Sequence, residues 1–198
     1  MLYEQRERFK GLSIKVGMIF SKIPLSPNQW TLLSLVPALA AAFFLAKEKF
    51  LEAAFFFAFA AFIDLIDGSV ARVLGRPTKF GAYLDTITDR YVEFMIILGM
   101  FFASLPSFYF SASAWLFLYL FGSMMTTYAK SAAKEKELVE KELKGGILER
   151  AERLVLLFIG IILASANSLW LVYILAVLAV LANITAMQRI LKAKSGNK

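Results

Sequence analysis

Cysteine and histidine are both absent from this chain of 198 residues. Their absence excludes disulfides, thiolate nucleophiles, imidazole bases and zinc sites built from Cys and His. Acid–base or metal chemistry must therefore use carboxylates. Charged residues are also few, at 19%, whereas hydrophobic residues make up 59%, above the roughly 45–50% that soluble domains contain. We therefore expect an integral membrane protein.

Long apolar stretches predict where the chain crosses the membrane. Residues 23–46 and residues 51–74 each suffice for one span, which needs about 20 residues. Residues 94–129 carry no charge, and as one helix they would extend about 54 Å, nearly twice the thickness of the hydrocarbon core. This stretch must fold back, and residues 104–107 (SLPS) are the expected turn.

The rest of the chain completes an all-α fold with six transmembrane helices. By the same arithmetic, residues 154–188 form two spans that meet near residues 165–168. The six spans lie within about 28–190, and residues 1–198 are expected to be a single membrane domain. Residues 3–22 place apolar groups at helical spacing among five basic residues, which predicts a juxtamembrane amphipathic helix in the interface.

Basic residues indicate the orientation of these spans. One side would carry five Lys or Arg in residues 3–22, three in 72–79, seven in 130–153 and four from Arg189 onward. The other side would carry only Lys47 and Lys49. Because basic loops stay on the cytoplasmic side, we expect a multi-pass protein of the cell membrane with both termini in the cytoplasm. The net charge of +7 is then explained by the bilayer, and no nucleic acid partner is expected.

Carboxylates and small residues form a pattern between the second and third spans, D-x2-D-G-x2-A-R-x8-G-x3-D-x3-D. On a helix Asp64 and Asp67 share one face, and Asp85 and Asp89 share another. Residues 75–77 (GRP) break the helix, so the two faces can meet. Four carboxylates at membrane depth would repel strongly unless cations bind. Oxygen-only ligands favour Mg²⁺ first, then Mn²⁺ or Ca²⁺.

This pattern resembles the defining motif of the CDP-alcohol phosphotransferase family, and all eight fixed positions match. The resemblance implies that Asp64, Asp67, Asp85 and Asp89 hold one or two divalent ions, Mg²⁺ or possibly Mn²⁺, and that Asp89 is the catalytic base. It also implies a homodimer. The nucleotide pocket that it implies is lined by Pro27, Asn28, Thr31, Asp64, Asp67, Gly68, Ala71, Arg72, Gly81 and Asp85.

Basic residues at the predicted inner face bear on the acceptor alcohol. Lys130, Arg150, Arg153 and Arg189 suit a phosphate monoester. The run E-R-A-E-R at 149–153 also resembles the E-R-P-E-R run of family members that use inositol phosphate, although Ala151 replaces the proline. Inositol phosphate is therefore the expected acceptor and glycerol phosphate the alternative. The expected function is phospholipid biosynthesis by transfer from a CDP-linked lipid, with release of CMP; CDP-diacylglycerol and CDP-archaeol both remain open as donors.

The same residues have other interpretations. Intramembrane aspartates usually mark an ion or proton path in a transporter, but such a path does not require the accompanying glycine, alanine and arginine. Arg90, directly after Asp89, is interpreted as a counter-ion beside that aspartate, and Glu93 has no assigned role at this point.

Overall fold

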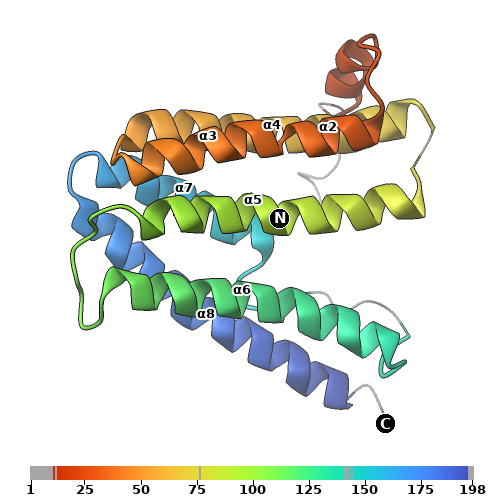
Figure 1. Ribbon diagram of the computed structural model, residues 1–198. Helices are drawn as coiled ribbons and strands as arrows, with labels where there is room; N and C mark the ends of the chain where they lie inside the picture. The colour runs from red at the N-terminus through yellow and green to blue at the C-terminus, as the bar shows by residue number, and fades with distance from the viewer. Residues whose placement is uncertain (1–10, 12, 76, 141–142, 144, 196–198) are drawn as a thin grey trace.

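A computed structural model describes residues 11, 13–75, 77–140, 143 and 145–195, which form a bundle of helices with no β-strand in this part of the chain (Figure 1). The expected all-α fold is therefore confirmed. The named helices are α2 (Pro27–Leu33), α3 (Leu35–Ala46), α4 (Phe50–Val73), α5 (Lys79–Phe101), α6 (Ala112–Glu135), α7 (Arg150–Ala164) and α8 (Ser168–Ser195).

The helices are arranged in layers around α5. In Figure 1, α2, α3 and α4 lie on one side of α5, while α6 and α8 lie on the other. α3 packs against both α4 and α5, α6 packs along α8, and α7 contacts α4 and α8. The start of α2, the end of α4 and the start of α5 lie at the same end of the bundle as the ends of α6 and α8 (Figure 1). Residues far apart in the sequence therefore meet at that end.

The first predicted span is divided into two helices at Ser34. Pro37, one turn later, has no backbone N–H, and its ring crowds the carbonyl four residues before it, which disrupts helical hydrogen bonding there. The Ser34 hydroxyl donates to the Thr31 carbonyl at 2.7 Å, and Ser34 keeps helical backbone angles. The chain therefore continues in nearly the same direction, and Pro27–Ala46 is 20 residues long.

The predicted turns occur where the sequence placed them. α4 ends at Val73 and is followed by Gly75, whose φ of 61° is favourable for glycine. Thr78 then caps α5, since its hydroxyl accepts from the Gly81 N–H at 2.9 Å. The loops at 104–107 and 165–168 separate α5 from α6 and α7 from α8, as expected.

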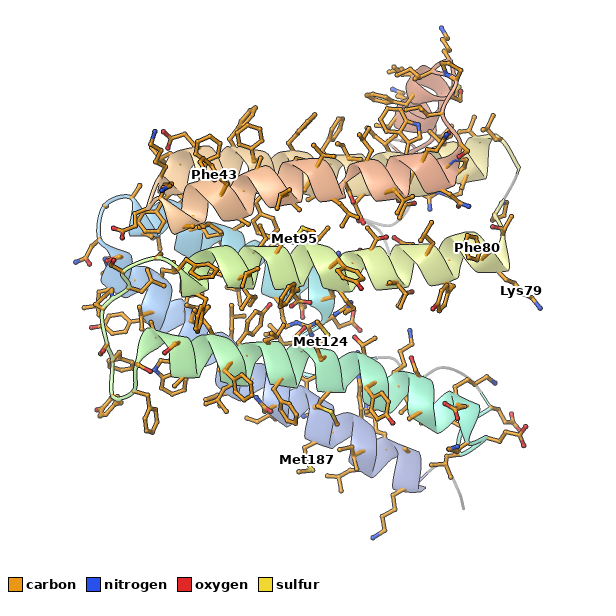
Figure 2. All side chains as sticks on the ribbon, viewed as in Figure 1. Phe43, Lys79, Phe80, Met95, Met124 and Met187 are labelled. Atoms are coloured by element: carbon orange, nitrogen blue, oxygen red, sulfur yellow. The ribbon has the colours of Figure 1, made fainter. Side chains whose placement is uncertain are left out.

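The outer surface of the bundle is largely apolar. Phe43 is 59% exposed and points away from the bundle, whereas Met95 lies between α5 and α3 (Figure 2). Among the described residues, Pro27–Ala46 and Ser168–Ser195 are long and apolar enough to cross a membrane. α4 and α5 are as long but carry the acidic residues, and α7 has only 15 residues. An exposed apolar surface of this extent favours a lipid environment.

The predicted N-terminal helix can be followed only in part. Residues 13–20 are helical, and Val16 and Phe20 pack on a small core that includes Ile66 and Val70 of α4. Residues 3–10 and 12 lie outside the described residues.

Candidate active site

Three aspartates converge at the end of the bundle where α4 ends and α5 begins. Asp64 and Asp67 lie in the C-terminal half of α4, and Asp85 lies in the second turn of α5. One carboxylate oxygen from each lies within 4.8 Å of the other two. Helical spacing brings the pair on α4 to one face, and the connection through Gly75 turns that face toward α5. The predicted meeting of the two acidic faces is therefore observed for these three residues.

The three carboxylates fit a divalent metal ion. Asp67 is buried, and its Oδ2 has no hydrogen-bond partner among the described residues. A buried carboxylate oxygen without a donor is costly unless a cation compensates it. Oxygen ligands are the ones that Mg²⁺ and Mn²⁺ prefer. The donor set and the unpartnered oxygen together match the metal site expected from the motif.

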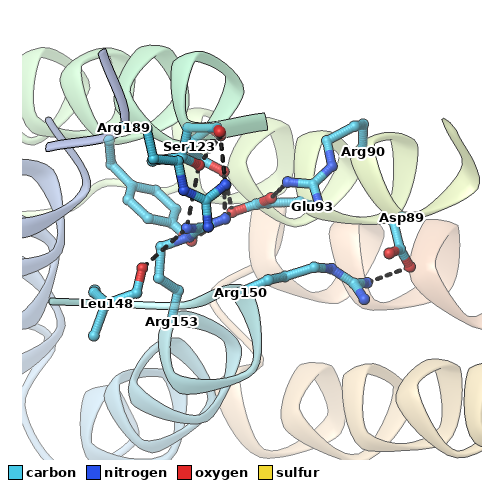
Figure 3. Close-up of polar contacts among 10 residues, drawn as sticks. Asp89, Arg90, Glu93, Ser123, Leu148, Arg150, Arg153 and Arg189 are labelled. Atoms are coloured by element: carbon cyan, nitrogen blue, oxygen red, sulfur yellow. Dashed lines mark hydrogen bonds and ion pairs between the residues drawn. The ribbon is translucent and has the colours of Figure 1, made fainter. Parts of the chain in front are cut away.

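Asp89 is held differently from the other three. It lies one turn beyond Asp85 on α5 and is buried. Its Oδ1 forms an ion pair with Nη2 of Arg150 at 2.5 Å, and Figure 3 shows Arg150 reaching across from α7. Asp89 is therefore in direct contact with a residue predicted to bind the acceptor.

A cavity of about 210 Å³ lies beside the carboxylates. Its lining comes from the start of α2, the end of α4 and the start of α5. The lining residues are Pro27, Asn28, Thr31, Asp67, Gly68, Ala71, Arg72, Pro77, Thr78, Gly81, Ala82 and Asp85. Every residue predicted for the nucleotide pocket except Asp64 is among them. Pro77, Thr78 and Ala82 were not predicted, although a hydroxyl residue directly before an amphipathic stretch is a signal for a helix cap.

Local interactions hold the cavity walls in place. Ser26 and Gln29 form a reciprocal cap at the start of α2, with Pro27 at the first helical position. This cap fixes Asn28 at the cavity. A Cβ atom on Gly81 would lie 3.2 Å from Oδ1 of Asn28 and 3.0 Å from Oγ1 of Thr78. Glycine at position 81 therefore lets α5 begin close to α2.

The predicted acceptor residues lie in the last part of α6, at the start of α7 and in the last part of α8. Arg189 on α8 donates from Nη1 to the Thr126 carbonyl oxygen at 2.7 Å. Lys130 lies one turn after Thr126 on α6 and is partly buried. Among the described residues, Nε of Arg150 and Nε of Arg189 are buried without a hydrogen-bond partner. These donors suit an anionic ligand.

Arg153 differs from the other predicted acceptor residues because it is only 1% exposed. Its Nη2 donates to Ser123 Oγ at 3.2 Å, and its Nη1 lies 3.4 Å from Thr126 Oγ1. Its Nε lies 3.8 Å from a carboxylate oxygen of Glu93. The structure thus places Arg153 inside the bundle, where it contacts Glu93 and Ser123.

Glu93 is a buried anion that contacts Arg90 and Arg153, and these residues form a buried cluster with Tyr119 and Ser123 (Figure 3). Its Oε1 accepts from Tyr119 and from Ser123, both at 2.7 Å, and its Oε2 accepts from Arg90 Nη1 at 3.1 Å. Arg90 is therefore a counter-ion to Glu93. Neither Glu93 nor Tyr119 has a role predicted from the sequence. A signal was present, because a charged residue within a long apolar stretch requires a partner.

Comparisons with known proteins find relatives and solved structures that match most of the chain. The chain is 31% identical over 198 residues to the archaetidylinositol phosphate synthase of Pyrococcus horikoshii, covering 98% of this chain and 97% of that protein. Two crystal structures of the phosphatidylinositol phosphate synthase of Mycobacterium tuberculosis share the fold. The one with manganese and citrate has a TM-score of 0.81 at 25% identity, covering 92% of this chain and 89% of that chain. The one with CDP-DAG bound has a TM-score of 0.79 at 24% identity, covering 91% and 92%.

The family profile described as CDP-alcohol phosphatidyltransferase matches residues 25–187. This match includes α2 to α7 and most of α8, and therefore both the carboxylate cluster and the cavity beside it. The chain belongs to the CDP-alcohol phosphatidyltransferase family.

Proposed function

We propose that this enzyme transfers a phosphatidyl or archaetidyl group from a CDP-linked lipid to a hydroxyl of inositol phosphate and releases CMP. The observation that carries the proposal is the ion pair between Asp89 and Arg150, because it joins the motif aspartates to the basic residues of α6, α7 and α8. The family membership and the names of the relatives, which are inositol phosphate lipid synthases, support the same assignment.

The donor nucleotide is proposed to bind in the cavity beside the aspartates. Gly68, Ala71 and Gly81 supply little side-chain bulk there, so a flat base can lie against backbone. Asp64, Asp67, Asp85 and Asp89 are proposed to hold one or two divalent ions, Mg²⁺ first and Mn²⁺ second. A bound divalent ion would neutralise charge on the donor pyrophosphate.

Asp89 is proposed as the base. Its carboxylate accepts the proton of the acceptor hydroxyl as that oxygen attacks the phosphorus attached to the lipid. A new P–O bond forms to the acceptor, and the bond between that phosphorus and the oxygen of CMP breaks. CMP leaves with the electron pair of the broken bond. The ion pair with Arg150 orients the Asp89 carboxylate while the acceptor arrives.

The acceptor phosphate is proposed to bind Arg150, Arg189 and Lys130. Arg150 and Arg189 each have a buried Nε without a partner among the described residues. A guanidinium group can donate two parallel hydrogen bonds to two oxygens of a phosphate. Arg153 was predicted as a further contact of the acceptor phosphate. It is instead proposed to stabilise the start of α7, where Arg150 lies, because its guanidinium is bound to Glu93 and Ser123.

The membrane arrangement is part of the same proposal. Six spans within about 28–190, an interfacial helix at 3–22 and a single domain over 1–198 would place the active site and both termini on the cytoplasmic side. The apolar exterior of the bundle supports the membrane environment. A homodimer is proposed from the family resemblance alone.

An acceptor panel tests the proposed substrate. The purified full chain in liposomes would be given Mg²⁺, CDP-diacylglycerol or CDP-archaeol, and labelled inositol phosphate, glycerol phosphate, inositol or serine. We expect labelled lipid with inositol phosphate above all others. A preference for glycerol phosphate would support the proposed phosphate-binding residues but would show that the acceptor is glycerol phosphate and not inositol phosphate. A preference for unphosphorylated inositol or serine would overturn the role of the basic residues.

A further inference from the structure

The helix at residues 13–20 packs directly against the C-terminal half of α4. Figure 1 shows this helix in red near the end of α4. A Cβ atom on Gly17 would lie 2.5 Å from the backbone oxygen of Ser69, so only glycine allows this approach. Phe20 of the same helix contacts Trp30 of α2 edge-on, with ring centroids 5.6 Å apart. The N-terminal helix is thus fixed against α2 and α4, two of the three helices that line the cavity.

A directed chain of hydrogen bonds connects this helix to Arg72. The Ser69 hydroxyl donates to the Leu65 carbonyl at 2.7 Å. Its single hydrogen is then used, so the Ser13 hydroxyl, 2.8 Å away, donates to Ser69 Oγ. Ser13 Oγ in turn accepts from Nη2 of Arg72 at 2.7 Å. Ser13 is 9% exposed and Ser69 is 0% exposed, so water does not readily replace either partner.

The guanidinium of Arg72 lies over Gly68 as a result. A Cβ atom built on Gly68 would be 3.5 Å from Arg72 Nη1, which places the guanidinium along the face of α4 that lines the cavity. Ser13 is the nearer of the two hydroxyl acceptors, since Ser69 Oγ lies 3.4 Å from Nη2. A long and otherwise exposed side chain is thereby held in one orientation.

We infer that Ser13 is a positioning residue for the donor site: through Arg72, the N-terminal helix forms part of the machinery that binds the CDP group. This inference rests on the proposed function, because it takes Arg72 as a nucleotide contact. It extends the donor site beyond the motif, to a segment outside the residues that the family profile matches.

The test compares two buried serines, of which Ser13 is the nearer acceptor for Arg72. Ser13→Ala removes the nearer acceptor for Arg72 and should raise the KM for the CDP-lipid and the Kd for CMP about 10- to 150-fold, the loss expected for one hydrogen bond to a charged group. The KM for the acceptor should not change. Ser69→Ala removes an even more buried hydroxyl but leaves the Ser13–Arg72 contact, so it should change CMP binding less. Ser13→Thr retains the hydroxyl and should restore binding.

Ser21→Ala provides the control within the same segment, since the Ser21 hydroxyl bonds to the Met18 carbonyl of its own turn. Isothermal titration of CMP in detergent micelles, with thermal unfolding of each variant, gives the readout. Equal losses in Ser13→Ala and Ser69→Ala would show that the hydroxyls only pack the helix, which overturns the inference.

Arg72→Ala separates the inference from the proposed function. If it leaves CMP affinity unchanged, the assignment of Arg72 to the donor site is wrong, and the role of Ser13 is lost with it. If it weakens CMP binding while Ser13→Ala does not, only the inference is wrong.

Discussion

Arg189 donates to the backbone carbonyl oxygen of Thr126 at 2.7 Å, which fixes the α8 arginine one helical turn from Lys130 of α6. This part of the proposed acceptor site therefore spans two helices that are far apart in the sequence but packed along each other. The donor cavity, by contrast, is lined by α2, α4 and α5 and the residues just before α5. Binding of the donor and binding of the acceptor should therefore be weakened by different substitutions.

Arg150→Gln and Arg189→Gln should raise the KM for inositol phosphate far more than the KM for the CDP-lipid. One lost charge-assisted contact corresponds to about 1.5–3 kcal/mol, or about 10- to 150-fold in kcat/KM. Steady-state kinetics with both substrates varied provides the measurement. Equal losses for donor and acceptor would mean that these arginines only anchor the helix ends.

Asp89→Asn should abolish turnover while CMP binding stays largely intact, because the amide keeps an oxygen but cannot accept the proton. Turnover would be followed as CMP release and affinity by titration of CMP. Appreciable activity in this variant would remove Asp89 from the role of base.

Asp67→Asn should weaken the binding of both Mg²⁺ and CMP, since the charge of a buried carboxylate is what balances the cation. The measurement is CMP affinity as a function of Mg²⁺ concentration. If the variant shows the same Mg²⁺ dependence as the wild type, Asp67 is not a metal ligand.

Glu93→Gln should destabilise the protein by about 3–5 kcal/mol, because it leaves the buried Arg153 without its anion. Tyr119→Phe removes one donor to the same carboxylate and should cost less, about 1.5–3 kcal/mol. Thermal unfolding in detergent measures both. Tyr128→Phe is the matched control, since Tyr128 is 66% exposed, and it should unfold like the wild type. A stable Glu93→Gln variant would contradict the structural role of the cluster.

The sequence predicted the parts of the fold that depend on local patterning. The length of the apolar stretches, together with the polar segments SLPS and SANS within them, located the turns at 104–107 and 165–168. The helical spacing of Asp64, Asp67 and Asp85 predicted their convergence, because both faces are fixed by a period of 3.6 residues. The break at Ser34 was not predicted, although Pro37, which disrupts the helical hydrogen bonding there, is visible in the sequence.

Interactions between distant helices were harder to predict. Tyr119, Ser123 and Thr126 recur at helical spacing on α6, which is a visible polar stripe, but nothing local shows that Glu93 and Arg153 face it. The burial of Arg153 was missed for that reason: a basic residue at a predicted membrane boundary suggests a loop position, and only the packing of α7 against its neighbours places it inside.

Product analysis of the reconstituted wild type tests the central claim most directly. With Mg²⁺, a CDP-linked lipid and labelled inositol phosphate, CMP and a lipid that carries the labelled inositol phosphate should form in equal amounts, and neither should form with Asp89→Asn. CMP release without labelled lipid, or labelled lipid formed equally well by Asp89→Asn, would contradict it.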